Sequence, residues 1–254
     1  MTTNAGRSRL SEVAVKSDLY AFRRDERLDG HEFDLQDLAD WLPSGNICVA
    51  KDDVGYYLSA LVIDNPPAGK TFYEAAQYLL PIVNGIGSLK SARFRAVKLD
   101  GRYEDGEKQH TVVGVGTIEV RSRVHAVGIV TGPDGKVKPQ LLPPGIAYAE
   151  LSARPDVAEA VRFLAAPGGG WVELYKVYEI IRDAVKPVAL DKFGLATKDE
   201  IRAFTGSADR PDVSGIGARH ARMGGGPPKR TMTELQAREF IGRLLRAWMD
   251  TLKR

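Results

Sequence analysis

Cys48 is the one cysteine in the chain, so the protein cannot form an internal disulfide. No apolar run approaches the roughly 18 residues that a membrane span requires, and residues 1–10 lack the apolar segment of a secretory signal. We therefore expect a soluble, cytoplasmic protein with no membrane partner. Cys48 lies in the apolar run 47–50, which predicts a buried strand cysteine, with a reactive thiol as the alternative.

Recognised catalytic motifs are missing as well. The chain has no P-loop, no nucleophile elbow, no zinc-protease helix motif and no paired-cysteine motif, which disfavours nucleotide hydrolysis, serine hydrolysis and zinc chemistry. Asp105, Glu107 and His110 could hold a metal ion, but their spacing is more typical of a solvated turn. We predict neither a metal nor a cofactor, and the sequence leaves open whether the protein is an enzyme.

Polar and charged residues dominate positions 1–32, which predict an N-terminal arm. The mixed charge run at 23–27 is typical of a solvated face. Residues 33–42 space their leucines at helical intervals and predict a short amphipathic helix. The chain as a whole is 43% hydrophobic, which is typical of a globular protein with a self-sufficient core.

Alternating and β-branched segments predict strands in the region 33–145. We expect these strands at 47–51, 56–63, 92–99, 110–115 and 118–130. Thr71 and Glu74 form a capping box, which predicts the start of a helix, and Pro81 should kink or split that helix. Residues 33–145 are therefore predicted to form a largely antiparallel sheet packed by a helix.

Helical periods replace the strand pattern beyond a proline-rich stretch at 139–145, which predicts a domain boundary. Ser152, Thr197 and Thr231 are predicted helix N-caps. Residues 146–254 therefore form a predicted helical domain. The predicted fold class is α+β, with an N-terminal, mainly antiparallel sheet and a packed helix, followed by a C-terminal helical bundle.

The segment 206–230 differs from the rest of the chain in charge and glycine content. It contains five basic and two acidic residues, an excess of three positive charges that equals the formal net charge of the whole protein. A loop of this length inside a compact domain is usually functional or disordered. The segment also contains His220, and its basic residues are Arg210, Arg219, Arg222, Lys229 and Arg230.

These side chains predict a phosphate site, because a guanidinium presents a planar fork of donors to phosphate oxygens. His220 is the predicted acid–base catalyst, and Arg219 is predicted to stabilise the charge of the phosphate. The predicted phosphate ligands are Arg210, Arg222, Lys229 and Arg230. The alternative is a flexible basic surface loop that His220 tethers to the helical bundle.

The helical half, with Arg210, Arg219 and His220, resembles HEPN domains, which are small helical bundles in bacterial toxins, defence proteins and RNA-processing factors. In that family an arginine and a histidine a few residues apart form a metal-independent ribonuclease site at a dimer interface. The resemblance implies RNA cleavage and a homodimer. The family spacing is not met, because Arg219 is adjacent to His220 and Arg210 lies further away than the family pattern places it.

Arginines also alternate along two of the expected strands. Arg93, Arg95, Arg121 and Arg123 would form a positive stripe along a phosphate backbone if the strands are neighbours, and a solvent-facing sheet surface is the alternative. For a bacterial cytosolic protein, the sequence thus predicts binding of RNA or another phosphate-bearing ligand through 206–230, with RNA cleavage as an additional activity. A non-enzymatic interaction or scaffold module with a protein partner is the alternative.

Overall fold

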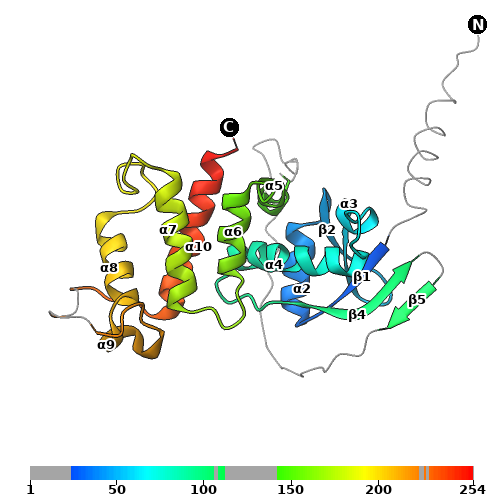
Figure 1. Cartoon of the computed structure of the whole chain (residues 1–254), viewed down its shortest axis with the longest axis horizontal. Helices are drawn as coiled ribbons and strands as arrows, with labels where there is room; N and C mark the ends of the chain where they lie inside the picture. The colour runs from blue at the N-terminus through cyan, green and yellow to red at the C-terminus, as the bar shows by residue number, and fades with distance from the viewer. Residues whose placement is uncertain (1–23, 106–107, 112–141, 223–225, 227–228, 254) are drawn as a thin grey trace, which may run out of the picture.

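The computed structural model describes residues 24–105, 108–111, 142–222, 226 and 229–253. Its fold is α+β, as predicted, with a five-stranded antiparallel sheet at one end of the molecule and the C-terminal helices at the other (Figure 1). The strands are β1 (Arg24–Asp29), β2 (Ile47–Lys51), β3 (Tyr56–Ala60), β4 (Lys98–Asp105) and β5 (Lys108–Thr111). The helices are α2 (Glu32–Trp41), α3 (Leu61–Asp64), α4 (Phe72–Lys90), α5 (Pro144–Leu151), α6 (Pro155–Leu164), α7 (Trp171–Ala184), α8 (Lys198–Ala208), α9 (Pro211–Ser214), the 3-10 turn η1 (Gly215–Gly217) and α10 (Glu234–Thr251).

The central strand β1 is formed by the sequence Arg-Asp-Glu-Arg-Leu-Asp, which contains a single apolar residue. It pairs with β3 on one side and β4 on the other, in the order β2-β3-β1-β4-β5. Glu26 lies opposite Leu58 and is completely buried, and Arg27 is 5% exposed. The predicted arm at 1–32 is therefore wrong for residues 24–29, because backbone pairing along both edges makes this strand without an apolar side-chain pattern.

The hairpin of β2 and β3 confirms the prediction for this region. Cys48 is buried in β2, and its thiol donates a hydrogen bond to the carbonyl of Pro43 across 3.4 Å. The second strand is shorter than predicted, because Leu61–Asp64 turns into helix α3.

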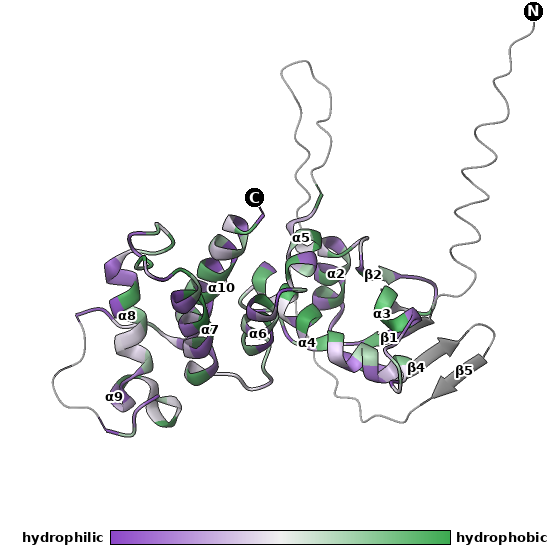
Figure 2. Ribbon diagram, turned by 45° about the horizontal axis from the view of Figure 1, so that its top comes forward, coloured by the Kyte–Doolittle hydropathy of each residue, from purple (hydrophilic) through white to green (hydrophobic). Residues whose placement is uncertain are grey.

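Helix α4 lies at the centre of the molecule. It contacts α2, α3, β1 and β4 on one side and α5, α6 and α10 on the other. It begins at the predicted capping box of Thr71 and Glu74, and it continues through Pro81 without the predicted split. Figure 2 shows that α4 is mostly hydrophobic, whereas α7, α8 and α10 mix hydrophobic and hydrophilic residues. Burial against elements on both sides offsets the backbone hydrogen bond that a proline removes.

The segment that joins α4 to β4 is not the strand predicted at 92–99, because β4 begins only at Lys98. The side chain of Asn84, on α4, accepts a hydrogen bond from the backbone N–H of Val97 at 2.8 Å and donates one to its carbonyl at 2.9 Å. This buried amide satisfies the backbone N–H and carbonyl of Val97, which a neighbouring strand would otherwise have to do, and it holds the segment against α4.

One apolar cluster runs from Leu28 in β1 to Met249 in α10. The predicted domains 33–145 and 146–254 therefore share a continuous core, because α4 packs against elements of both. The predicted boundary near residue 145 falls inside α5. The C-terminal region is helical, as predicted, in the part of the chain that the structure describes.

Two of the predicted helix caps lie elsewhere. Ser152 ends α5, where its hydroxyl donates to the carbonyl of Tyr148, so α6 begins after Arg154. Helix α10 begins after Thr233 rather than Thr231, because the backbone N–H of Met232 is held by the hydroxyl of Ser207 at 2.8 Å. The predicted cap Thr197 is confirmed, with Glu200 completing its capping box.

Candidate functional site

The segment 206–230 is only partly a loop. Helix α8 extends into it as far as Ala208, and α9 and η1 then occupy residues 211–217. The described residues beyond η1 are 218–222, 226 and 229–230. The predicted site residues therefore lie on short structured pieces rather than on one continuous loop.

Arg210 joins two parts of this segment. Its guanidinium donates to both carboxylate oxygens of Asp212, at 2.9 and 3.0 Å, and to the carbonyl of Gly226 at 3.0 Å. The hydrogen bond from Arg210 is the main reason that the pKa of Asp212 lies below its usual range. Because Arg210 is 7% exposed and faces these partners, it stabilises the segment and is not an accessible phosphate ligand.

Arg219 and His220 meet at one carboxylate, that of Asp209. The nearest nitrogen of Arg219 lies 3.4 Å from Oδ1 of Asp209, and Nε2 of His220 lies 3.7 Å from the same atom. The side chains of Arg219 and His220 are 38% and 47% exposed, so both can reach a ligand from solvent. Arg219 and His220 thus lie together beside Asp209, which the sequence analysis did not single out.

An aromatic surface supports Arg219. Its guanidinium lies over the ring of Tyr175, 4.2 Å from the ring centre, and its backbone N–H donates to the carbonyl of Ala208 at 2.8 Å. Burial raises the pKa of Tyr175, and the charge of Asp209 adds to this effect. The phenol therefore stays neutral and acts as a platform for the cation.

The chemistry of this group is limited to one imidazole and positive charge. The 3.7 Å between His220 and Asp209 is longer than a hydrogen bond, although the carboxylate could still orient the ring. Arg219 shares its charge with Asp209 and with Glu179, whose oxygen lies 3.7 Å away. Among the residues that the structure describes, no cluster of His, Cys, Asp or Glu side chains could hold a metal ion. Glu107, which belongs to the predicted metal alternative, lies outside them.

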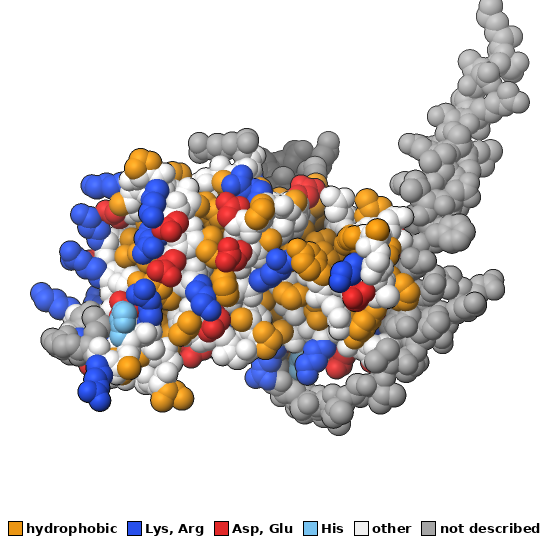
Figure 3. All heavy atoms as spheres, in the orientation of Figure 1, with side chains coloured by type: hydrophobic (Ala, Val, Ile, Leu, Met, Phe, Trp, Pro, Cys, Tyr) orange, Lys and Arg blue, Asp and Glu red, His pale blue; other side chains and the backbone are white. Residues whose placement is uncertain are grey.

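The remaining predicted phosphate ligands are accessible. Arg222, Lys229 and Arg230 are exposed, and none forms an ion pair with a carboxylate in the described residues. Lys198 and Arg202 of α8 are exposed as well. Figure 3 shows Lys and Arg side chains in a row along this end of the molecule, next to a histidine. Of the predicted phosphate ligands, Arg210 is therefore buried, whereas Arg222, Lys229 and Arg230 are exposed at the basic end of the molecule.

Two other surface features were not predicted as sites. An apolar hollow of about 760 Å³ lies between α3, α4 and α5, and Leu61 and Tyr78 on its rim are 66% and 64% exposed. A basic hollow of about 300 Å³ lies between α4 and α10. The sequence signal for the basic hollow was Arg93, which was assigned to a sheet together with Arg95. Arg121 and Arg123, their expected neighbours, lie outside the described residues.

No helix in the described ranges is both long and apolar enough to cross a membrane. No protein-family model, no curated protein and no solved structure matches the chain.

Proposed function

We propose that the protein binds the phosphate backbone of RNA with the basic end defined by Lys198, Arg202, Arg222, Lys229 and Arg230. The observation that carries this proposal is that all five side chains are exposed and that Arg222, Lys229 and Arg230 have no carboxylate partner among the described residues. Lys and Arg side chains gather along this end of the molecule in Figure 3. Exposed Lys and Arg side chains displace condensed counterions from a nucleic acid, which supplies affinity without sequence preference. Arg219, held over Tyr175, adds a cation at the border of this surface.

Replacing Arg222, Lys229 and Arg230 together by alanine is expected to weaken binding of a single-stranded RNA oligonucleotide and to flatten its salt dependence. Each lost phosphate contact should reduce the slope of log K against log salt by about 0.7, so three contacts reduce it by roughly 2. Fluorescence anisotropy from low to moderate salt measures both quantities. The exposed positions of these side chains predict little change in thermal stability.

A matched control removes the same charge from outside the basic end. Lys51, Lys70 and Arg154 are 52%, 59% and 51% exposed, and each is paired with a carboxylate. Their triple alanine variant should leave the salt slope close to that of the wild type. Equal slopes for both triple variants would contradict the assignment of this surface, and no RNA binding by the wild type at low salt would contradict RNA binding altogether.

RNA cleavage is a further part of the proposal, with His220 as the acid–base residue. It is supported by the approach of His220 and Arg219 to the shared carboxylate of Asp209. His220→Ala is then expected to reduce cleavage about 100-fold, the usual contribution of a general acid or base, while RNA affinity stays near that of the wild type. Single-turnover cleavage of a labelled RNA in EDTA measures this rate. Equal cleavage by wild type and variant would leave RNA binding in place and remove the catalytic role.

The second candidate function is a protein-interaction module. It is favoured by the apolar hollow between α3, α4 and α5, where Leu61 and Tyr78 are exposed. Exposed apolar patches with a polar rim are typical of protein interfaces. This candidate predicts an apolar helix or strand of a partner as the ligand, and it is favoured over RNA binding if the wild type fails to bind RNA at low salt.

A further inference from the structure

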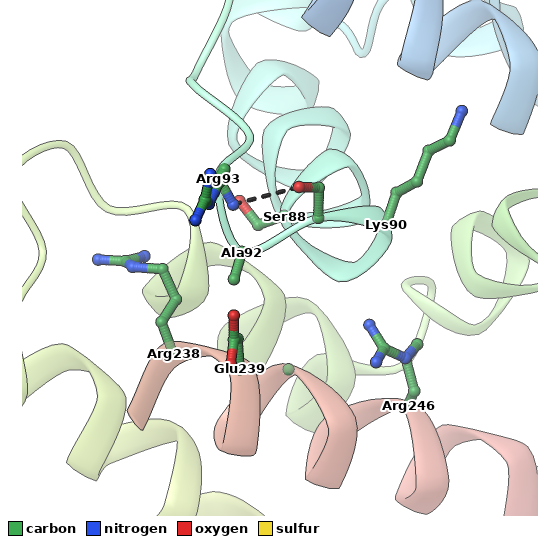
Figure 4. Close-up of a pocket in the computed structure, with 9 residues that line it drawn as sticks. Ser88, Lys90, Ala92, Arg93, Arg238, Glu239 and Arg246 are labelled. Atoms are coloured by element: carbon green, nitrogen blue, oxygen red, sulfur yellow. Dashed lines mark hydrogen bonds between the residues drawn. The ribbon is translucent and has the colours of Figure 1, made fainter. Parts of the chain in front are cut away.

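The basic hollow between α4 and α10 has a wall of positively charged side chains (Figure 4). Its volume is about 300 Å³, near the lower limit for small-molecule sites. The residues that line it and matter for its chemistry are Ser88, Arg93, Arg238, Glu239, Gly242 and Arg246. They come from the end of α4, from the segment that follows it and from one face of α10.

Two of the arginines are held in place by backbone carbonyls. Arg238 donates to the carbonyls of Leu164 and Gly169, at and after the end of α6, and Arg246 donates to the carbonyl of Leu89 in the last turn of α4. These bonds use part of each guanidinium, which has five N–H donors. The two cations are therefore preorganised at the rim, and they retain donors for an anion.

Arg93 supplies the third cation from the segment that follows α4. Its backbone N–H donates to the hydroxyl of Ser91 at 3.2 Å, which sets the turn that carries it. Figure 4 shows Arg93 and Arg238 on the same side of the hollow, with Glu239 between Arg238 and Arg246. Lys90 points away from this centre and forms ion pairs with Asp37 and Asp40.

A second hollow of about 320 Å³ adjoins the first, because the two share Ser88 and Arg238. Its lining includes the apolar side chains of Phe94 and Pro167, together with the charged side chains of Arg95 and Glu234. The pair of hollows thus places an apolar surface next to a cationic one. This combination fits a ligand with an anionic head and a flat, weakly polar body.

We propose that these two hollows bind a phosphate monoester of mononucleotide size. The phosphate lies beside Arg93, Arg238 and Arg246, and the body of the ligand lies against Phe94 and Pro167. The site is separate from the basic end that we assign to RNA, because it shares no residue with it. Two carboxylates oppose the phosphate and lower the affinity: Glu239 in the first hollow, and Glu234, which lines the second and lies 3.8 Å from Arg238.

Calorimetric titration of the full chain with AMP, inorganic phosphate and adenosine tests this site. AMP is expected to bind more tightly than phosphate or adenosine alone, since only AMP occupies both hollows. Arg93→Ala should weaken AMP binding about 10-fold, the effect of losing one charge-assisted contact. Glu239→Gln should strengthen it several-fold, because a facing negative charge is removed.

Two further variants separate this site from a general charge effect. Arg243→Ala removes a cation from α10 that pairs with Glu200 on α8, and it should leave AMP affinity unchanged. Gly242→Leu places a side chain in the hollow and should abolish AMP binding, and its thermal transition checks that the variant is folded.

Absence of AMP binding at millimolar concentration, or equal affinities for wild type, Arg93→Ala and Glu239→Gln, would overturn the proposal. The Arg222, Lys229 and Arg230 variant should still bind AMP, which distinguishes this site from the RNA surface.

Discussion

Gly85→Ala is expected to lower the free energy of unfolding by about 2 kcal/mol, a typical effect of overpacking a core. A Cβ at position 85 would overlap Cγ1 and the carbonyl oxygen of Val161 and lie 3.0 Å from its carbonyl carbon. The backbone of α6 cannot move away as a flexible side chain could, so α4 and α6 must separate. The preference of alanine for helices, about 1 kcal/mol over glycine, recovers only part of this loss.

Urea unfolding and thermal denaturation measure the effect of Gly85→Ala. For a chain of this size, 2 kcal/mol corresponds to a decrease of roughly 4–8 °C in Tm. Gly242→Ala is the matched control, because a Cβ there would lie 3.9 Å from its nearest neighbour, the carbonyl oxygen of Ser88. This control should be as stable as the wild type or more stable. A Gly85→Ala protein as stable as Gly242→Ala would show that the two helices are not packed through Gly85.

Glu26 is expected to make the protein less stable as the pH rises from about 4.5 to about 7. Its side chain is completely buried, and neither carboxyl oxygen has a hydrogen-bond partner among the described residues. Burial raises the pKa of Glu26 from 4.5 to about 7. Through Glu26 the folded protein therefore binds more protons than the unfolded chain in this range, so the contribution of Glu26 to stability is fully present below pH 4.5 and is lost as the pH rises. The loss is about 3 kcal/mol at 1.36 kcal/mol for each pKa unit.

Glu26→Gln should remove this pH dependence, because the amide resembles the protonated carboxyl group and does not ionise. Relative to the wild type, the free energy of unfolding of the variant should increase by up to about 3 kcal/mol as the pH rises from 4.5 to 8. Urea unfolding of both proteins at several pH values measures the difference, in which the other titrating groups cancel. The hydrogen bond from Arg27 lowers the pKa of Asp52 to about 2. The contribution of Asp52 to stability is therefore lost as the pH falls below 4, outside the range in which Glu26 loses its proton. A constant difference between the two proteins from pH 5 to pH 8 would contradict a raised pKa for Glu26.

Part of the candidate site could be predicted from the sequence. The excess of positive charge in 206–230 and the adjacency of Arg219 and His220 are properties of a short stretch of chain. The role of Arg210 could not be predicted, since its partner Gly226 is brought near only by the path of the segment between them. Asp209 was counted only as a negative charge, because nothing local indicates that both candidate residues approach its carboxylate.

The basic hollow between α4 and α10 could be predicted from the sequence even less than the role of Arg210. Arg93 precedes Arg238 and Arg246 by more than half of the chain, and no local pattern joins them. The alternation of Arg93 and Arg95 predicted a strand, but the side chain of Asn84 binds the backbone at Val97 and keeps the segment out of the sheet. A buried amide on a helix gives no periodic signal that would reveal this partner.

The sequence by itself determined the features that depend on neighbouring residues. The capping box at Thr71, the helix cap Thr197, the hairpin of β2 and β3 and the helical character of the C-terminal region follow from interactions within a few positions. Only the tertiary structure decided that a charged stretch becomes the central strand β1, and that α4 joins the sheet and the helices in one core. Backbone pairing and burial between distant segments stabilise these arrangements, and such interactions leave no regular pattern along the chain.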